Sequence, residues 1–225
     1  MFAAVNPTLA QNWALTSAPP SYWSSIASSA DGTKLVALAW PWMSTDGGVY
    51  ISANSGTTWR QTGAPIWPLS AVASSADGTK LVVATFVEGA YLGRIYTSTN
   101  SGATWAPTSG TPYAYFNSVA CSADGSRLIA AAGYTTPNVI YVSTNSGATW
   151  TSSSPASTWY SVACSADGTK LVAVAFPLGS EGFPIYTSTN SGVSWTPASA
   201  PKAFWYGVAS SADGTKLVSS AKFMG

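Results

Sequence analysis

Three acidic side chains stand apart from the rest of this sequence and could perform acid-base chemistry. Asp46, Glu88 and Glu181 lie in segments rich in glycine and aromatic residues, whereas the other five of the eight acidic residues belong to a repeated Asp-Gly motif. A pair of carboxyl groups about 5–10 Å apart is the arrangement that hydrolyses a glycosidic bond. If the chain is an enzyme, these three carboxylates are its candidate catalytic residues and a glycoside is its candidate substrate.

Other catalytic and metal chemistry is poorly represented. The chain has no histidine, which removes the most common general base and metal ligand, and a Ser-His-Asp triad with it. Cys121 and Cys164 stand where equivalent segments carry serine. Equivalent positions in neighbouring repeats should lie too far apart for a disulfide, which needs Cα atoms within about 7 Å. We interpret both cysteines as small buried thiols and predict neither a metal site nor a cofactor.

Aromatic side chains offer a second kind of chemistry, the binding of neutral ligands. The sequence has 11 Trp and 11 Tyr but only 8% charged residues. An aromatic ring packs against the apolar face of a sugar while nearby hydroxyl and amide groups bond its polar edges. The candidate ligand-binding residues are Trp23, Trp40, Trp42, Tyr91, Phe116, Asn117, Trp159, Tyr160, Trp205 and Tyr206. The alternative interpretation is that these rings fill the centre of the molecule or pack between its repeated units.

The elements that must position these residues repeat along the chain. The segment YTSTNSGATW ends at Trp105, and the spacings between its four related copies are 46, 45 and 45 residues. These copies end at Trp59, Trp105, Trp150 and Trp195. A second motif beginning SADG occurs five times, at Ser29, Ser75, Ser122, Ser165 and Ser211. A fixed period of this length indicates a repeat architecture.

A single repeat, residues 158–196, shows what each unit contains. Short apolar and alternating runs are separated by an Asp-Gly turn, a Gly- and Pro-containing loop and an Asn-Ser-Gly turn, and no segment has a helical period. Four strands in about 45 residues are typical of a propeller blade. The sequence therefore predicts an all-β fold, a five-bladed β-propeller of four-stranded antiparallel blades, in one domain spanning residues 1–225.

The two ends of the chain contain complementary parts of one unit. Residues 203–225 match the first two strands of a blade, and residues 1–19 match the last two when Trp13 is aligned with Trp59. We expect the fifth blade to be shared between these segments, because such a closure leaves no open sheet edge at the seam. The alternative is a part of a larger ring that needs a partner chain.

The Asn-Ser-Gly segments resemble the Asp-box of BNR, or sialidase-like, repeats, which has the form Ser-x-Asp-x-Gly-x-Thr-Trp. Asparagine replaces the family's aspartate at Asn54, Asn100, Asn145 and Asn190, and its side chain can still bond its own turn. The resemblance implies a propeller in which these turns are scaffold, on the face away from the active site. It does not extend to the sialidase active site, which uses three arginines, since only Arg60 and Arg94 lie outside the repeated motif.

The variable residues of each unit should share the opposite face. In a propeller, the loops from strand two to strand three and from strand four to the next blade lie together, and all three spare carboxylates and the aromatic candidates fall there. Alignment of the units gives one column of Trp23, Leu69, Phe116, Trp159 and Trp205. The next column contains Ser24, Ser70, Asn117, Tyr160 and Tyr206. Binding usually resides in variable loops on a rigid scaffold, so we expect ligands on this face.

Composition narrows the class of function further. A net charge of +1 provides no electrostatic footprint for nucleic acid. No apolar run reaches the roughly 18 residues of a membrane span, and the first residues lack the features of a secretory signal. The Ser, Thr, Asn and Gly content nevertheless suits an extracellular module. We predict a monomeric, non-catalytic, lectin-like propeller that binds glycans; the alternatives are a glycoside-acting enzyme and a natural or engineered scaffold without a small-molecule ligand.

Overall fold

The computed structural model describes residues 15–40, 47–64, 68–85, 93–111, 113–133, 138–155, 157–175 and 182–222. These residues contain 18 strands in five antiparallel sheets and no helix. The first sheet consists of β1 (Tyr22–Ser28), β2 (Leu35–Trp40), β3 (Gly48–Ser52) and β4 (Arg60–Gln61). The second consists of β5 (Leu69–Ser74), β6 (Leu81–Thr85), β7 (Ile95–Ser98) and β8 (Ala106–Pro107).

The remaining sheets repeat this plan. The third consists of β9 (Phe116–Cys121), β10 (Leu128–Ala132), β11 (Ile140–Ser143) and β12 (Thr151–Ser152). The fourth consists of β13 (Trp159–Cys164), β14 (Leu171–Ala175), β15 (Ile185–Ser188) and β16 (Thr196–Pro197). The fifth contains two described strands, β17 (Phe204–Ser210) and β18 (Leu217–Lys222). In every four-stranded sheet the spatial order of the strands follows their order in the chain.

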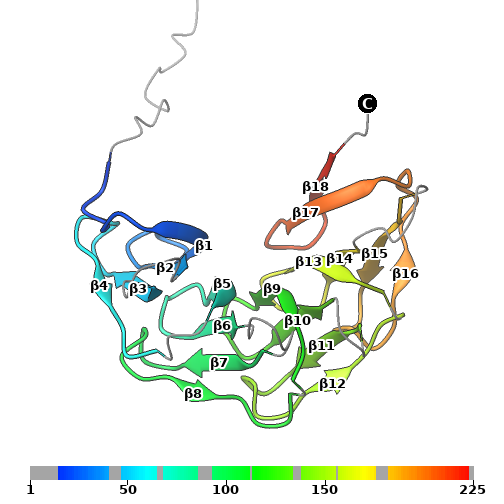
Figure 1. Cartoon of the computed structure of the whole chain (residues 1–225). Coiled ribbons are helices and arrows are strands. Elements are labelled where there is room, and N and C mark those ends of the chain that lie inside the picture. Colours follow the sequence, from blue (N-terminus) through cyan, green and yellow to red (C-terminus); the bar gives the residue numbers. More distant parts are fainter. Residues whose placement is uncertain are drawn as a thin grey trace, which may run out of the picture.

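The five sheets follow one another around an arc, with the first strand of each sheet innermost (Figure 1). The all-β fold and the four-stranded antiparallel blades predicted from the sequence are confirmed, and the five sheets fit the five predicted blades. Over the described residues the arc is open, since the first and last sheets do not meet (Figure 1). Trp13 and the other residues before Leu15 lie outside the described residues, so a fifth blade shared between the chain ends remains a prediction.

The hydrophobic core lies between neighbouring blades. The second strand of each complete blade is covered on both faces, and β6, β10 and β14 are buried along their whole length. This explains their uninterrupted apolar sequences, such as Leu-Val-Ala-Val-Ala in β14, because an alternating pattern suits a strand with one wet face. One cluster joins Val82 and Ile95 of the second blade to Phe116 and Val119 of the third.

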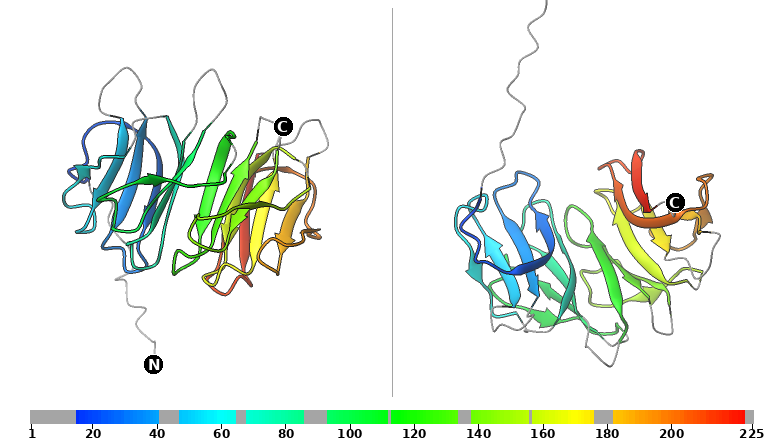
Figure 2. Two further views of the ribbon diagram at one scale, coloured as in Figure 1. Left: turned by 90° about the horizontal axis from the view of Figure 1, so that it is seen from below. Right: turned by 45° about the horizontal axis from the view of Figure 1, so that its top comes forward.

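The two repeated turns lie at the same end of the sheets. Leu35, which follows the Asp-Gly turn, pairs with Ser52, which precedes the Asn-Ser-Gly turn, whereas Tyr22 and Trp40 pair at the other end of the sheet. Turns and strand ends therefore separate into two faces, which can be followed in the side view of Figure 2. We call them the turn face and the open face, the latter being where β1, β5, β9, β13 and β17 begin. This separation agrees with the sequence prediction.

Side-chain hydrogen bonds build the Asn-Ser-Gly turn. In the third blade, the Ser143 hydroxyl donates to Asn145 Oδ1 at 3.0 Å and accepts the Gly147 N–H at 2.9 Å. Asn145 Oδ1 also accepts the Thr149 N–H at 2.9 Å. Gly147 has φ 88°, a left-handed conformation that favours glycine. Asparagine thus supports the turn through its side-chain oxygen, as the sequence predicted.

Candidate functional site

Each innermost strand has one β-bulge near the open face, at the same position in all five blades. The pairing register skips one residue, so that the two residues on either side of the skipped one oppose successive residues of the partner strand. The skipped residues, called the bulge residues below, are Ser24, Ser70, Asn117, Tyr160 and Tyr206. They are the second aligned column of the sequence. A bulge redirects a side chain out of the regular pleat and is frequent beside functional sites.

The polar bulge residues bond to backbone carbonyls. Asn117 Nδ2 donates to Trp159 O of the next blade at 2.7 Å, and the Ser70 hydroxyl donates to Ala84 O at 3.1 Å. The first of these bonds is possible because residue 133 is a glycine. A Cβ at that position would lie 2.6 Å from Asn117 Nδ2 and 3.0 Å from Trp159 O, too close for either atom. Asn117 is therefore held in one orientation across the seam between the third and fourth blades.

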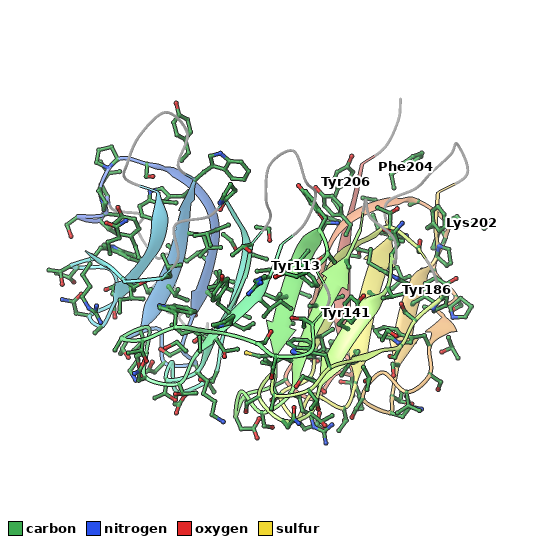
Figure 3. The ribbon with its side chains drawn as sticks, turned by 60° about the horizontal axis from the view of Figure 1, so that its bottom comes forward. Tyr113, Tyr141, Tyr186, Lys202, Phe204 and Tyr206 are labelled. Carbon is green, nitrogen blue, oxygen red and sulfur yellow. The ribbon has the colours of Figure 1, made fainter. Side chains whose placement is uncertain are left out.

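The two tyrosines form the aromatic part of the candidate site. The rings of Tyr160 and Tyr206 meet edge to face across the seam between the fourth and fifth blades, with centroids 5.5 Å apart and an interplanar angle of 78°. Tyr206 is 37% exposed and Tyr160 is half-buried. Figure 3 shows Tyr206 with Phe204 at the upper edge of the fifth sheet. The pair presents an exposed phenol at the open face, supported by the half-buried ring behind it.

Trp205 lies beside this pair and is also held in place. Its indole Nε1 donates to Phe183 O at 3.0 Å, and the side chain is half-buried. Trp40, the last residue of β2, is half-buried and lies opposite Tyr22, which is 67% exposed. Both tryptophans therefore lie at the open-face ends of their strands, with part of their surface covered.

Two of the candidate aromatics are buried instead. Phe116 and Trp159 are both 0% exposed. Trp159 meets Tyr186 edge to face at 5.4 Å, packs against Trp195 at 6.2 Å, and donates its Nε1 proton to Pro155 O at 3.2 Å. Neither ring has a face on which a sugar could stack in this structure. The alternative interpretation, packing within and between blades, describes these two residues, and we leave them out of the candidate site.

Trp23 occupies the corresponding place in the first blade but is 39% exposed. Its ring contacts are those of Trp159, with Tyr50 edge to face at 5.3 Å and Trp59 at 6.2 Å. The difference in exposure arises because no described sheet covers the first blade on that side. Its exposure therefore does not by itself mark a ligand site.

The remaining candidates cannot be placed. Trp42 and Tyr91, and the carboxylates of Asp46, Glu88 and Glu181, lie outside the described residues. The acidic residues that are described all belong to the Asp-Gly turns. Hydrogen bonds from a serine hydroxyl and from a threonine N–H and hydroxyl lower the pKa of Asp31 and Asp167 to about 2. Such carboxylates stay ionised at neutral pH, so neither carries the proton that a carboxylic general acid would donate.

Two further features were not singled out from the sequence. The Arg94 guanidinium lies 4.5 Å from the ring centroid of Tyr113, which is 51% exposed. On the turn face, a hollow of about 250 Å³ between the first two blades is lined by residues including Lys34, Trp59 and Arg60. The equivalent hollow between the second and third blades measures about 10 Å³. The larger hollow is therefore not a repeated feature of the fold.

The described residues show neither a metal cluster nor a membrane helix. No three His, Cys, Asp or Glu side chains gather in that part of the chain. It also contains no helix of the length and apolar character needed to cross a membrane.

Comparison with known proteins identifies the fold. No protein-family model matches the chain, and no curated protein sequence does, so membership of the Asp-box family remains a prediction. Among solved structures, the GH74 xyloglucanase from Xanthomonas campestris is 19% identical, with a TM-score of 0.63 over 84% of this chain and 33% of that one. YCF48 from Cyanidioschyzon merolae is 18% identical, with a TM-score of 0.60 over 89% of this chain and 64% of that one.

A third neighbour comes from a complex of nidogen with laminin, at 10% identity and a TM-score of 0.64 over 90% of this chain and 73% of that one. These neighbours are β-propeller proteins, and identities this low show the fold alone. The chain spans about a third or less of the length of the GH74 proteins. The comparisons therefore support the propeller architecture, and a function must be argued from the site.

Proposed function

We propose that this protein is a non-catalytic propeller that binds neutral carbohydrate on its open face. Tyr206, Tyr160 and Asn117 are the central contacts, and the surrounding contacts are Trp205, Trp40, Trp42 and Tyr91. The observation that carries the proposal is the bulge present in all five inner strands. The backbone geometry is the same in each blade, while the bulge residue changes from serine to asparagine to tyrosine.

The differences between the bulge residues of the five blades suit a ligand-binding role. The turn face repeats almost the same residues in every blade, as expected of a scaffold, whereas the bulge residues differ in size and polarity at a constant backbone position. Strand β1, which carries Ser24, lies across the arc from β17, which carries Tyr206 (Figure 1). An uncharged ligand with one apolar face and several hydroxyl groups is complementary to such a surface.

The neighbours with solved structures are compatible with this proposal without deciding it. The GH74 proteins include a xyloglucanase, YCF48 was solved bound to a D1 peptide, and nidogen was solved with laminin. Carbohydrate is favoured for this chain because the described open face contains aromatic and hydroxyl groups and few charges. The proposal does not depend on ring closure, since Tyr160 and Tyr206 lie on adjacent blades within the arc.

A glycan array on the purified chain tests the proposal, followed by calorimetry with the glycan that binds best. Tyr206→Ala removes a stacking ring worth about 1 kcal/mol or more, so the Kd should rise about five- to tenfold. Tyr206→Phe retains the ring and should lose less. Val193→Ala is the matched control, because Val193 is an apolar residue, 80% exposed, in a turn-face loop. A Kd unaffected by Tyr206→Ala, or no bound glycan, contradicts the proposed site.

The enzyme alternative is tested on the same protein. Asp46→Asn, Glu88→Gln and Glu181→Gln are compared with the unchanged chain for release of reducing sugar from the bound glycan. A non-catalytic module shows no turnover in any of them. Hydrolysis that disappears with one of these substitutions contradicts the proposal and assigns that carboxylate to catalysis.

A further inference from the structure

The first blade exposes an apolar face that its counterparts bury. Ile26 on β1 is 65% exposed. The residues at the same position in the next three inner strands are almost fully covered by the preceding blade: Val72 at 6%, Val119 at 7% and Val162 at 5%. Trp23 shows the same contrast with Trp159. This face of the first blade thus has the composition of a buried seam but no described sheet against it.

The last blade also exposes apolar residues that the other blades bury. Val218 is 68% exposed and Leu217 is 46% exposed, whereas the equivalent Val172 and Leu171 in β14 are 0% and 3% exposed. Within the described residues β18 pairs with β17 alone, while each equivalent strand has a neighbour on both sides. An apolar strand with one open edge is a template for a further strand.

The four seams that are present share one set of contacts at the Asp-Gly turns. At each seam a backbone N–H of one turn donates to a backbone carbonyl of the next at 2.7 Å, through Ala30, Ala76, Ala123, Ala166 and Ala212 in succession. The basic residue of one blade also lies over the turn glycine of the next. A Cβ on Gly78 would lie 2.7 Å from Lys34 Cδ, and one on Gly214 would lie 2.8 Å from Lys170 Cβ.

The two ends of the arc contain the unmatched halves of this same seam. No atom lies within 4 Å of a Cβ built on Gly32, so the place taken by a basic side chain in the other seams is open. The residue that would fill it by repetition is Lys216. The corresponding backbone bond would join the Ala212 N–H to Ala30 O. The ends therefore match each other in chemistry and in polarity of the hydrogen bond.

Residues 16 and 17 show where the preceding part of the chain arrives. The Thr16 methyl group would be 3.4 Å from a Cβ on Gly56, and the Ser17 hydroxyl donates to Thr57 O at 2.5 Å. Between complete blades the same contacts come from the segment after the outer strand. For example, Ser109 donates to Ala148 O at 3.0 Å. Residues 15–18 therefore occupy the place of the chain leaving a preceding blade.

We propose that the fifth sheet of the same chain docks on the first blade through a fifth copy of the seam, with Lys216 over Gly32 and the Ala212 N–H bonded to Ala30 O. Closure would bury Trp23, Ile26 and Val218 as their counterparts are buried. It requires the angle between blades to change, a change that the four existing seams share. A closed ring also brings Trp40 and Tyr22 toward Tyr206 on the open face.

Cross-linking between the two ends tests the proposal in the full chain. The background is Cys121→Ser with Cys164→Ser, since the other three repeats carry serine there. Ala30→Cys with Ala212→Cys is treated with a short bis-maleimide, and Ala76→Cys with Ala123→Cys is the control for a seam whose turns are joined at 2.7 Å. We expect an intrachain cross-link in a yield within about twofold of the control, with monomeric mass by light scattering.

The alternatives give different results in the same experiment. Cross-links that join two chains show that a second copy fills the seam, and the absence of cross-links beside an efficient control shows that the arc stays open. Either outcome overturns the proposal.

Discussion

Replacing Trp159 by alanine distinguishes a core residue from a ligand-binding residue. The side chain is 0% exposed, contacts the rings of Tyr186 and Trp195, and bonds Pro155 O through its indole nitrogen. Truncation removes these contacts and leaves a cavity in the hydrophobic cluster between the third and fourth blades. The neighbouring rings are themselves fixed by backbone pairing or by packing, so the cavity should collapse only partly.

The expected cost follows from burial. Truncating a fully buried tryptophan to alanine costs about 3–5 kcal/mol of unfolding free energy. For a chain of this size about 1 kcal/mol corresponds to roughly 2–4 °C, so the melting temperature should fall by roughly 6–20 °C. Trp159→Phe retains most of the ring, so its melting temperature should lie between those of the unchanged protein and Trp159→Ala. Urea denaturation followed by tryptophan fluorescence and circular dichroism gives the free energies directly.

Trp23→Ala is the informative partner of this experiment. Trp23 has the same two ring contacts, but it is 39% exposed in the open arc. If the first blade is covered by the fifth, the two truncations should cost similar amounts, whereas an open arc makes the Trp23 change the smaller. A Trp159→Ala variant that unfolds at the urea concentration of the unchanged protein refutes the assignment of this ring to the core.

Three further predictions concern the turns and the thiols. The pKa of Asp31, Asp167 and Asp213 is about 2 against an ordinary 3.8, chiefly because a serine hydroxyl donates to each carboxylate. Because the folded pKa is below the unfolded one, the stabilisation is complete above about pH 4 and is lost as the pH falls toward 2. The urea midpoint should therefore decline across that window, and it should decline less steeply in Ser29→Ala. A urea midpoint that stays constant from about pH 4 to pH 2 contradicts this prediction. Burial raises the pKa of Cys121 and Cys164 to about 12, so iodoacetamide at pH 8 should label them far more slowly in the folded chain than in urea, and equal rates count against a buried pair. Ser143→Ala leaves the buried Gly147 N–H without its acceptor and should cost about 1–3 kcal/mol, while exposed Thr149→Ala, measured by the same denaturation, should cost less.

The repeat period, the strand content and the two turn types were predictable from the sequence, because each depends on residues close together in the chain. Asp-Gly and Asn-Ser-Gly signals recur in phase, and the apolar runs between them are too short and too regular for helices. The prediction that Asn145 supports its turn also held, because its hydrogen bonds reach no further than Thr149. Even the two faces followed from antiparallel order alone.

The bulges could not be predicted from the local sequence. Alignment placed Ser24, Ser70, Asn117, Tyr160 and Tyr206 in one column, but that these residues leave the strand register depends on how the inner strand pairs with its neighbour. The bond from Asn117 to Trp159 O joins residues 42 apart, and it needs the absence of a side chain at Gly133. No spacing rule contains such a contact.

Trp23 and Trp159 show most clearly which properties the sequence determines and which depend on the tertiary structure. They share a column, a strand position and the same pair of aromatic neighbours, and their sequences suggested equal candidates for ligand binding. In the structure one is buried and the other is 39% exposed. A residue type and its local repeat determine which way a side chain points and what it touches within its own blade. Whether that side chain meets water is decided by the neighbouring blade, because burial depends on the surface that another part of the chain brings against it.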